Sequence, residues 1–173
     1  MAASWCGVSA AKGPAVPAPL PPPALASASG PDSPPATAEV RGRLEAHEWV
    51  LSKVYDDAGH EQAGWRMAGM DGGPAMRMGF YRHGNVTAMV CNFISLDYAL
   101  AGNDGMRMVG RMQTMAACSV QGLMDLEARV GRQLPQVRRY ALATGVDAGP
   151  RLELRFADGS RWELEGRDKP LRP

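Results

Sequence analysis

The chain has 173 residues and a formal net charge of +1, with 14 prolines and three cysteines. It contains no run of about 18 apolar residues, so we expect no membrane-spanning helix. Its charges nearly balance, which argues against a protein that works by neutralising nucleic-acid phosphates, so no nucleic-acid partner is expected.

The amino-terminal 38 residues differ in composition from the rest of the chain. They contain nine prolines but only two charged residues, Lys12 and Asp32. A segment rich in proline, alanine and serine buries too little apolar surface to offset its chain entropy. Residues 1–38 are therefore predicted to be a disordered tail or tether with polyproline II character, and residues 39–173 to form one domain.

From residue 39 onward most of the sequence has the two-residue periodicity of β-strands. Apolar and polar side chains alternate, and Gly, Asn and Asp turn signals separate the runs, which predicts antiparallel hairpins. Residues 56–73 are polar and glycine-rich and are expected to form a long surface loop. The predicted strands are 48–55, 76–80, 86–93, 97–100, 106–109, 137–143, 151–156 and 161–165.

One helix is predicted between residues 119 and 135. Apolar residues recur at helical spacing from Val120 to Leu134, and charged residues, Glu127 among them, take the remaining surface. Ser119 can cap its start, and Pro135 ends it. This order of elements predicts an α+β fold, in which a bent, mostly antiparallel sheet forms a partial barrel with one main helix packed on it. The residues expected in the core are Trp49, Leu51, Phe80, Leu123, Leu152, Leu154 and Phe156.

Several short motifs follow one another in a specific order. They are Trp49-x-Leu51, Cys91-Asn92, Thr114-Met115-Ala116-Ala117-Cys118, a helix carrying Glu127, Tyr140, and Leu152-x-Leu154 before Asp158-Gly159. Between residues 43 and 166 this pattern resembles the META domain, the HslJ-like family of bacterial heat-shock-associated and envelope proteins. The resemblance implies a small pseudobarrel with a helix packed on it. Members are often secreted or lipid-anchored and linked to stress or drug tolerance, and no family-wide catalytic activity is established.

On this basis we expect a non-enzymatic protein of the bacterial cell envelope that serves stress tolerance or envelope maintenance. It would act by binding or scaffolding through its sheet surface and loops, as a monomer without a cofactor, on an unknown protein or small-molecule partner. The expected location is the periplasm or the outer membrane, with the cytoplasm as the alternative.

The three cysteines bear on this location. Cys91 and Cys118 occupy two of the family's motif positions and are a candidate disulfide in an oxidising compartment. Cys6 is left over and precedes a spacer rich in alanine and proline, as in mature bacterial lipoproteins, so it is a candidate for lipidation and membrane tethering. The alternative is three reduced thiols in a cytoplasmic protein, two of them buried.

Ten methionines fall between residues 67 and 124, and most are expected to fill the core. Met76 and Met78, like Met106 and Met108, form Met-x-Met pairs whose sulfurs share one strand face. Because thioethers are ligands for Cu(I), these four residues are a candidate copper site. An alternative function is therefore periplasmic Cu(I) binding, or redox buffering by methionine oxidation.

A second alternative is a small enzyme or divalent-ion site in the loop around residues 56–70. Asp56, Asp57, His60 and Glu61 cluster there. The sequence has no serine-nucleophile elbow, no phosphate-binding glycine loop and no paired-cysteine zinc spacing, so no catalytic residues are predicted.

Overall fold

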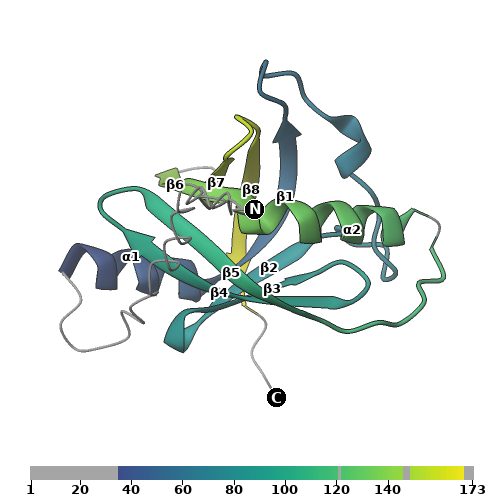
Figure 1. The fold of residues 1–173 in the computed structure, drawn as a ribbon, viewed down its shortest axis with the longest axis horizontal. Helices are drawn as coiled ribbons and strands as arrows, with labels where there is room; N and C mark the ends of the chain where they lie inside the picture. The colour runs from purple at the N-terminus through teal and green to yellow at the C-terminus, as the bar shows by residue number, and fades with distance from the viewer. Residues whose placement is uncertain (1–34, 121, 146–148, 170–173) are drawn as a thin grey trace, which may run out of the picture.

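The computed structural model describes residues 35–120, 122–145 and 149–169. Eight antiparallel strands close into a barrel, in which each strand pairs with the next along the chain and β8 pairs with β1 (Figure 1). The strands are β1 (His47–Tyr55), β2 (Arg77–Tyr81), β3 (Asn85–Met89), β4 (Phe93–Ala101), β5 (Gly105–Gln113), β6 (Val137–Gly145), β7 (Gly149–Phe156) and β8 (Arg161–Asp168). The helices are α1 (Pro35–Ala46) and α2 (Leu123–Gln133), with three 3₁₀ turns at Ala63–Trp65, Arg82–Gly84 and Leu134–Gln136.

The prediction of an antiparallel barrel with one main helix, α2, is confirmed, but the barrel is closed rather than partial. Its seam lies between β5 and β6, which share a single residue pair, Gly105 with Arg139. The backbone N–H of Tyr140 adds a hydrogen bond to the carbonyl oxygen of Asp104 at 2.8 Å. A Cβ atom at Gly105 would lie 2.5 Å from the carbonyl oxygen of Ala101, so the turn before the seam requires glycine.

Two predicted boundaries are wrong for local backbone reasons. The predicted strand 86–93 is broken, because β3 ends at Met89 and β4 begins at Phe93, with a turn at residues 90–92. The predicted helix starts later than Ser119, since Gly122 has a φ of +85°, a left-handed conformation that a continuous right-handed helix excludes. Helix α2 therefore begins at Leu123, and Ser119 does not cap it.

Helix α1 was not expected, and it takes up the last four residues of the predicted tail. It packs against the barrel through Leu44, which is fully buried, and Val40, which is partly buried. The indole N–H of Trp49 donates to the Leu44 carbonyl oxygen at 2.9 Å and ties the helix to β1. Residues 1–34, most of the predicted tail, lie outside the described residues.

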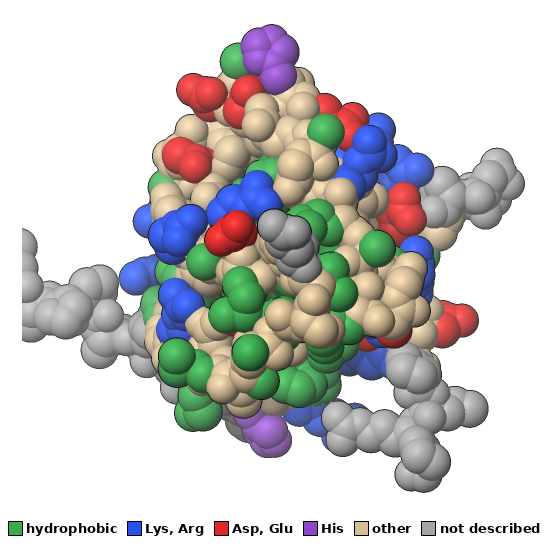
Figure 2. Space-filling view, turned by 90° about the vertical axis from the view of Figure 1, so that its right-hand side faces the viewer, with side chains coloured by type: hydrophobic (Ala, Val, Ile, Leu, Met, Phe, Trp, Pro, Cys, Tyr) green, Lys and Arg blue, Asp and Glu red, His purple; other side chains and the backbone are tan. Residues whose placement is uncertain are grey.

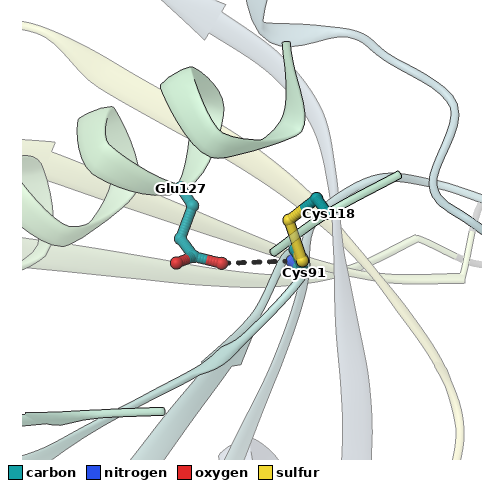
Figure 3. A group of neighbouring side chains, drawn as sticks. All are labelled: Cys91, Cys118 and Glu127. Atoms are coloured by element: carbon teal, nitrogen blue, oxygen red, sulfur yellow. Dashed lines mark hydrogen bonds between the residues drawn. A yellow bond between two sulfur atoms is a disulfide. The ribbon is translucent and has the colours of Figure 1, made fainter. Parts of the chain in front are cut away.

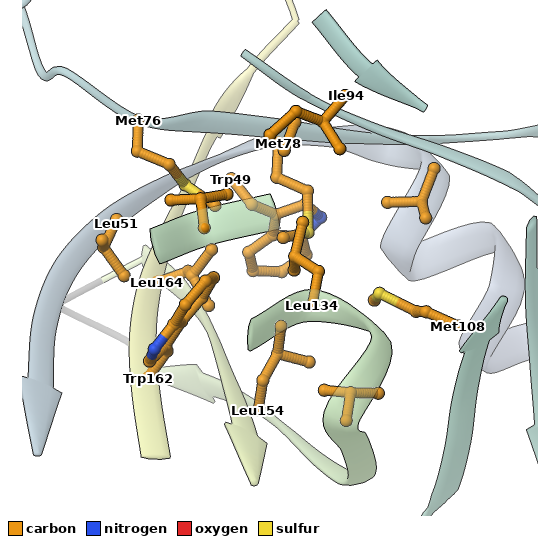
Figure 4. Close-up of a cluster of buried hydrophobic side chains, with 14 of the residues drawn as sticks. Trp49, Leu51, Met76, Met78, Ile94, Met108, Leu134, Leu154, Trp162 and Leu164 are labelled. Carbon is orange, nitrogen blue, oxygen red and sulfur yellow. The ribbon is translucent and has the colours of Figure 1, made fainter. Parts of the chain in front are cut away.

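The barrel interior is filled by side chains (Figure 4). All seven residues predicted for the core are buried. Trp49 and Trp162 are the largest of the fully buried side chains, and four methionines pack among the aliphatic residues. None of the helices in the described ranges is long and apolar enough to cross a bilayer.

Candidate functional site

A carboxylate from α2 holds the turn at residues 90–92. Glu127 is only 2% exposed. Its Oε2 atom accepts the backbone N–H group of Asn92 at 2.6 Å. The same atom accepts the backbone N–H group of Cys91 at 3.3 Å (Figure 3). Its Oε1 atom accepts the side-chain amides of Asn92, at 3.2 Å, and of Gln113. Four donors thus converge on one buried carboxylate, which joins α2 to the β3–β4 turn and the end of β5.

Asn92 carries this network to the segment that follows β5. Its Oδ1 atom accepts the backbone N–H of Ala116 at 2.7 Å, and its Nδ2 atom donates to the Ala116 carbonyl oxygen at 3.0 Å. The hydroxyl of Thr114 accepts the backbone N–H of Phe93 at 3.0 Å. The side chain of Asn92, which is 3% exposed, therefore replaces a missing strand partner for residues 114–116.

The predicted disulfide joins Cys91 to Cys118, with Cα atoms 6.0 Å apart. It fixes the same turn to the segment before α2 by a covalent bond. We refer to Glu127, Asn92, Gln113 and this disulfide as the Glu127 clamp. The two sulfurs and a Glu127 oxygen lie within 4.8 Å of one another. In the oxidised state each sulfur is bonded to the other and both carboxylate oxygens already accept hydrogen bonds, so the clamp offers a metal ion no free ligand.

The sequence prediction placed Glu127 on the polar surface of the helix, and this is wrong. The position of Glu127 on the helix would have predicted its burial. Leu123, Leu126, Val130 and Leu134 form the buried stripe, and residue 127 follows residue 123 by one helical turn. A carboxylate on the apolar side of a helix must be hydrogen-bonded in the fold, and the turn at residues 90–92 provides the donors.

Exposed apolar side chains surround the clamp. Met115 is 95% exposed, Met112 76%, Phe93 53% and Met124 48%. The Met124 sulfur lies 3.1 Å from the Cys118 sulfur. Figure 2 views the molecule from the end at which α2 begins, and hydrophobic side chains gather over the lower half of that face. Large exposed apolar patches of this kind mark interaction surfaces in soluble proteins.

A groove of about 180 Å³ lies beside this surface, on the outer face of β1 to β4. The strand register builds it. Phe93, Met89 and Arg77 form one row across β4, β3 and β2, and Thr87, Gly79 and Glu48 form the next. The residues that line it are Glu48, Arg77, Met78, Gly79, Tyr81, Thr87, Met89, Phe93 and Lys169. We call it the outer groove.

Gly79 gives the outer groove its floor. A Cβ atom at this position would lie 2.9 Å from the Tyr81 hydroxyl, so the tyrosine side chain folds back over the bare backbone of β2. Tyr81 is 39% exposed and presents its ring to solvent. Together with Phe93 it supplies two exposed aromatic rings, one on each of two strands.

Two of the three charged residues that line the groove, Arg77 and Lys169, have partners within the protein. Arg77 forms an ion pair and hydrogen bond with Asp71, and this lowers the pKa of the Asp71 carboxyl group. The Lys169 ammonium group donates to the carbonyl oxygens of Glu45 and, at 3.0 Å, Phe80. It also lies 4.9 Å from the centre of the Tyr81 ring, within cation–π range. The groove therefore offers a ligand the rings of Tyr81 and Phe93 and the Met89 side chain, with the Glu48 carboxylate at its edge.

Of the other predicted site residues in the described ranges, only Met78 borders the outer groove. Met76, Met78, Met106 and Met108 are each at most 2% exposed and belong to the barrel core. Strands β2 and β5, which carry three of them, are separated in the barrel by β3 and β4. Cys6 lies outside the described residues.

In the loop after β1, the carboxylates bond to neighbouring side chains and backbone. The Asp56 carboxylate accepts the backbone N–H of His60 at 2.8 Å and the Gln62 amide at 2.9 Å, and the first of these bonds lowers the pKa of Asp56. Glu61 pairs with Arg66 at 3.4 Å. These interactions account for both groups without an ion, and Asp57 is exposed beside them.

The barrel, the Cys91–Asn92 turn and the glutamate of α2 can now be compared with known proteins. A family model described as the META domain matches residues 42–169. The chain belongs to the META domain family.

No curated protein matches this META-domain chain. Among solved structures, a protein from Burkholderia xenovorans determined by NMR is similar at a TM-score of 0.59 and 19% identity, covering 81% of this chain and 98% of that one. A crystal structure of a DUF4847 family protein from Bacteroides vulgatus is similar at a TM-score of 0.53 and 12% identity, covering 75% of this chain and 99% of that one. At these identities, the two likenesses show a shared fold.

Proposed function

We propose that this META-domain chain is a non-enzymatic protein of the bacterial cell envelope that serves stress tolerance or envelope maintenance by binding. The observation that carries the proposal is the contrast between its interior and its exterior. Core side chains fill the barrel, whereas the outer groove and the exposed Phe93 and Met115 lie on the surface. The Glu127 clamp fixes the turn that precedes Phe93 and the backbone next to Met115. A rigid scaffold that presents apolar surface is suited to hold a partner.

The clamp also supports an envelope location. Stable disulfides form and persist in oxidising compartments such as the bacterial periplasm, and are rare in the cytosol. The Cys91–Cys118 bond fixes the segment between β5 and α2, which carries Met115. A tether through Cys6, which this proposal includes, would hold the domain at the membrane that bounds that compartment.

Complementation in the native bacterium tests the binding role. A deletion strain grown under envelope stress is supplied with the wild-type chain or with a Tyr81→Ala/Phe93→Ala variant, which removes both exposed rings of the outer groove. We expect the variant to accumulate and melt like the wild type but to lose protection. The matched control is Glu165→Gln on the exposed face of β8. Full protection by the double variant would remove the groove from the function.

The exposed methionines favour a second candidate function, redox buffering. Met115 and Met112 are the most exposed of the large apolar side chains in the described residues, so their sulfurs are open to oxidants. The copper alternative has less support, because its four candidate ligands lie in the core. Anaerobic titration with Cu(I) decides it, since the absence of binding tighter than micromolar rules it out.

A further inference from the structure

The outer groove continues into a second depression that runs beside α1. That depression is lined by Gly42, Glu45, Ala46, Phe80, Tyr81, Arg82, His83 and Lys169. Tyr81 and Lys169 line both features. A trough therefore leads from the flank of α1, across the Tyr81 ring, to the groove in front of Phe93.

The chemistry of this trough fits an extended, proline-rich chain. Such segments adopt the polyproline II helix, lose little entropy on binding, and dock into shallow grooves lined by aromatic side chains. Tyr81 and Phe93 supply the rings, Met89 adds an adaptable apolar wall, and Gly79 has no side chain, which lets the Tyr81 ring lie over β2. Proline has no backbone N–H, so a proline-rich chain needs fewer acceptors from the groove than other extended peptides.

We propose that the occupant is this chain's own segment 14–23, PAVPAPLPPP. Six of its ten residues are proline and none is charged. The chain enters α1 at Pro35, so the eleven residues 24–34 connect the segment to the helix that borders the trough. Extended at 3.1 Å per residue they reach about 34 Å. The 12 residues of α1 are only about 18 Å long. The connection is therefore long enough to return along the helix to the groove.

The short connection also makes weak docking sufficient. A short flexible linker gives an effective concentration of about 1 mM, so a segment with an intrinsic Kd of about 1 mM occupies the groove about half of the time. This inference rests on the proposed binding role of the outer groove and adds its regulation, since partners must displace the segment before they bind.

Paramagnetic relaxation in the full chain tests the inference. A Cys6→Ser/Ala24→Cys variant carries a single free thiol when the Cys91–Cys118 disulfide is intact, and this thiol takes a nitroxide label next to the proline segment. We expect the amide signals of Gly79, Thr87 and Phe93 to lose most of their intensity, because relaxation by a nearby nitroxide is averaged over the docked and free states, and to recover when ascorbate reduces the nitroxide. Two matched controls should abolish the loss: Tyr81→Ala/Phe93→Ala, and replacement of the six prolines by serine at unchanged length.

Each other outcome overturns the inference. Loss confined to the first turn of α1, or a loss that the proline-to-serine chain retains, means that the segment does not recognise the groove. Contacts between molecules are measured in a mixture of two samples: chain that carries the nitroxide but no ¹⁵N, and ¹⁵N-labelled chain without a nitroxide. Loss of the groove signals in that mixture means that the segment of a second copy is the occupant. An unperturbed groove means that only a foreign partner can fill it. That result would leave the complementation test of the proposed function unaffected, so the two failures are distinguishable.

Discussion

Replacing Glu127 by glutamine is expected to destabilise the fold although the side chain keeps its size. Glutamine presents an NH₂ group where glutamate presents an acceptor. Either the backbone N–H groups of Cys91 and Asn92 or the side-chain amides of Asn92 and Gln113 then face another donor. A buried donor without an acceptor costs about 1–3 kcal/mol. Because the Cys91 bond is long, at 3.3 Å, we expect a total loss of about 2–4 kcal/mol.

Urea denaturation followed by tryptophan fluorescence measures this loss, since Trp49 and Trp162 are buried. The Glu127→Gln variant should also melt roughly 10 °C below the wild type. The matched control is Glu165→Gln, which changes an exposed glutamate and should shift the free energy of unfolding by less than about 0.5 kcal/mol. If the two variants are equally stable, the carboxylate does not hold the turn and the clamp is misassigned.

Three further predictions concern the core, the disulfide and a buried phenol. Leu154 is fully buried, so Leu154→Ala should lower the free energy of unfolding by about 2–5 kcal/mol in the same denaturation assay. An unchanged urea midpoint would contradict the assignment of Leu154 to the buried face of β7. The disulfide joins residues 27 apart in sequence, so its reduction should lower the free energy of unfolding by roughly 3–4 kcal/mol. Thermal melting with and without dithiothreitol measures this loss, and equal melting temperatures would count against a stabilising disulfide. Burial raises the pKa of Tyr98 from 10.0 to about 12, so the stability from this neutral phenol is complete below pH 10 and is lost as the pH rises towards 12. Burial also raises the pKa of Tyr140, so an alkaline titration of tyrosinate absorbance should show late titration by both groups. Tyr98→Phe should remove the Tyr98 part, and an unchanged titration curve in that variant would contradict the assignment.

The strands were predictable because their signal is local. Alternation such as Leu152 and Leu154 against Glu153 fixes which face is buried, without knowledge of the neighbours. Closure of the barrel was not predictable in this way. It depends on Gly105 meeting Arg139, a pairing between residues far apart in sequence that no periodicity encodes.

Helix α1 escaped prediction because only Val40 and Leu44 give it an apolar side, and its docking depends on the indole of Trp49. In the candidate site, one feature was predictable from the sequence and another was not. The Cys91–Cys118 pairing follows from the family's motif positions, whereas the outer groove exists only because the register places Gly79 and Thr87 beside each other. The buried role of Glu127 was within reach of the helical spacing, but charge alone suggested a surface position.

The central claim is that this is an envelope protein whose binding surface is held by an oxidised clamp. The most direct measurement is fractionation of the native bacterium with thiols blocked during lysis, followed by the intact mass of the chain. We predict that the chain is found in the envelope fraction and that its mass includes a lipid on Cys6. Cys91 and Cys118 should react with the blocking reagent only after a reductant has been added. A chain found in the cytosol with Cys91 and Cys118 both blocked would contradict the account.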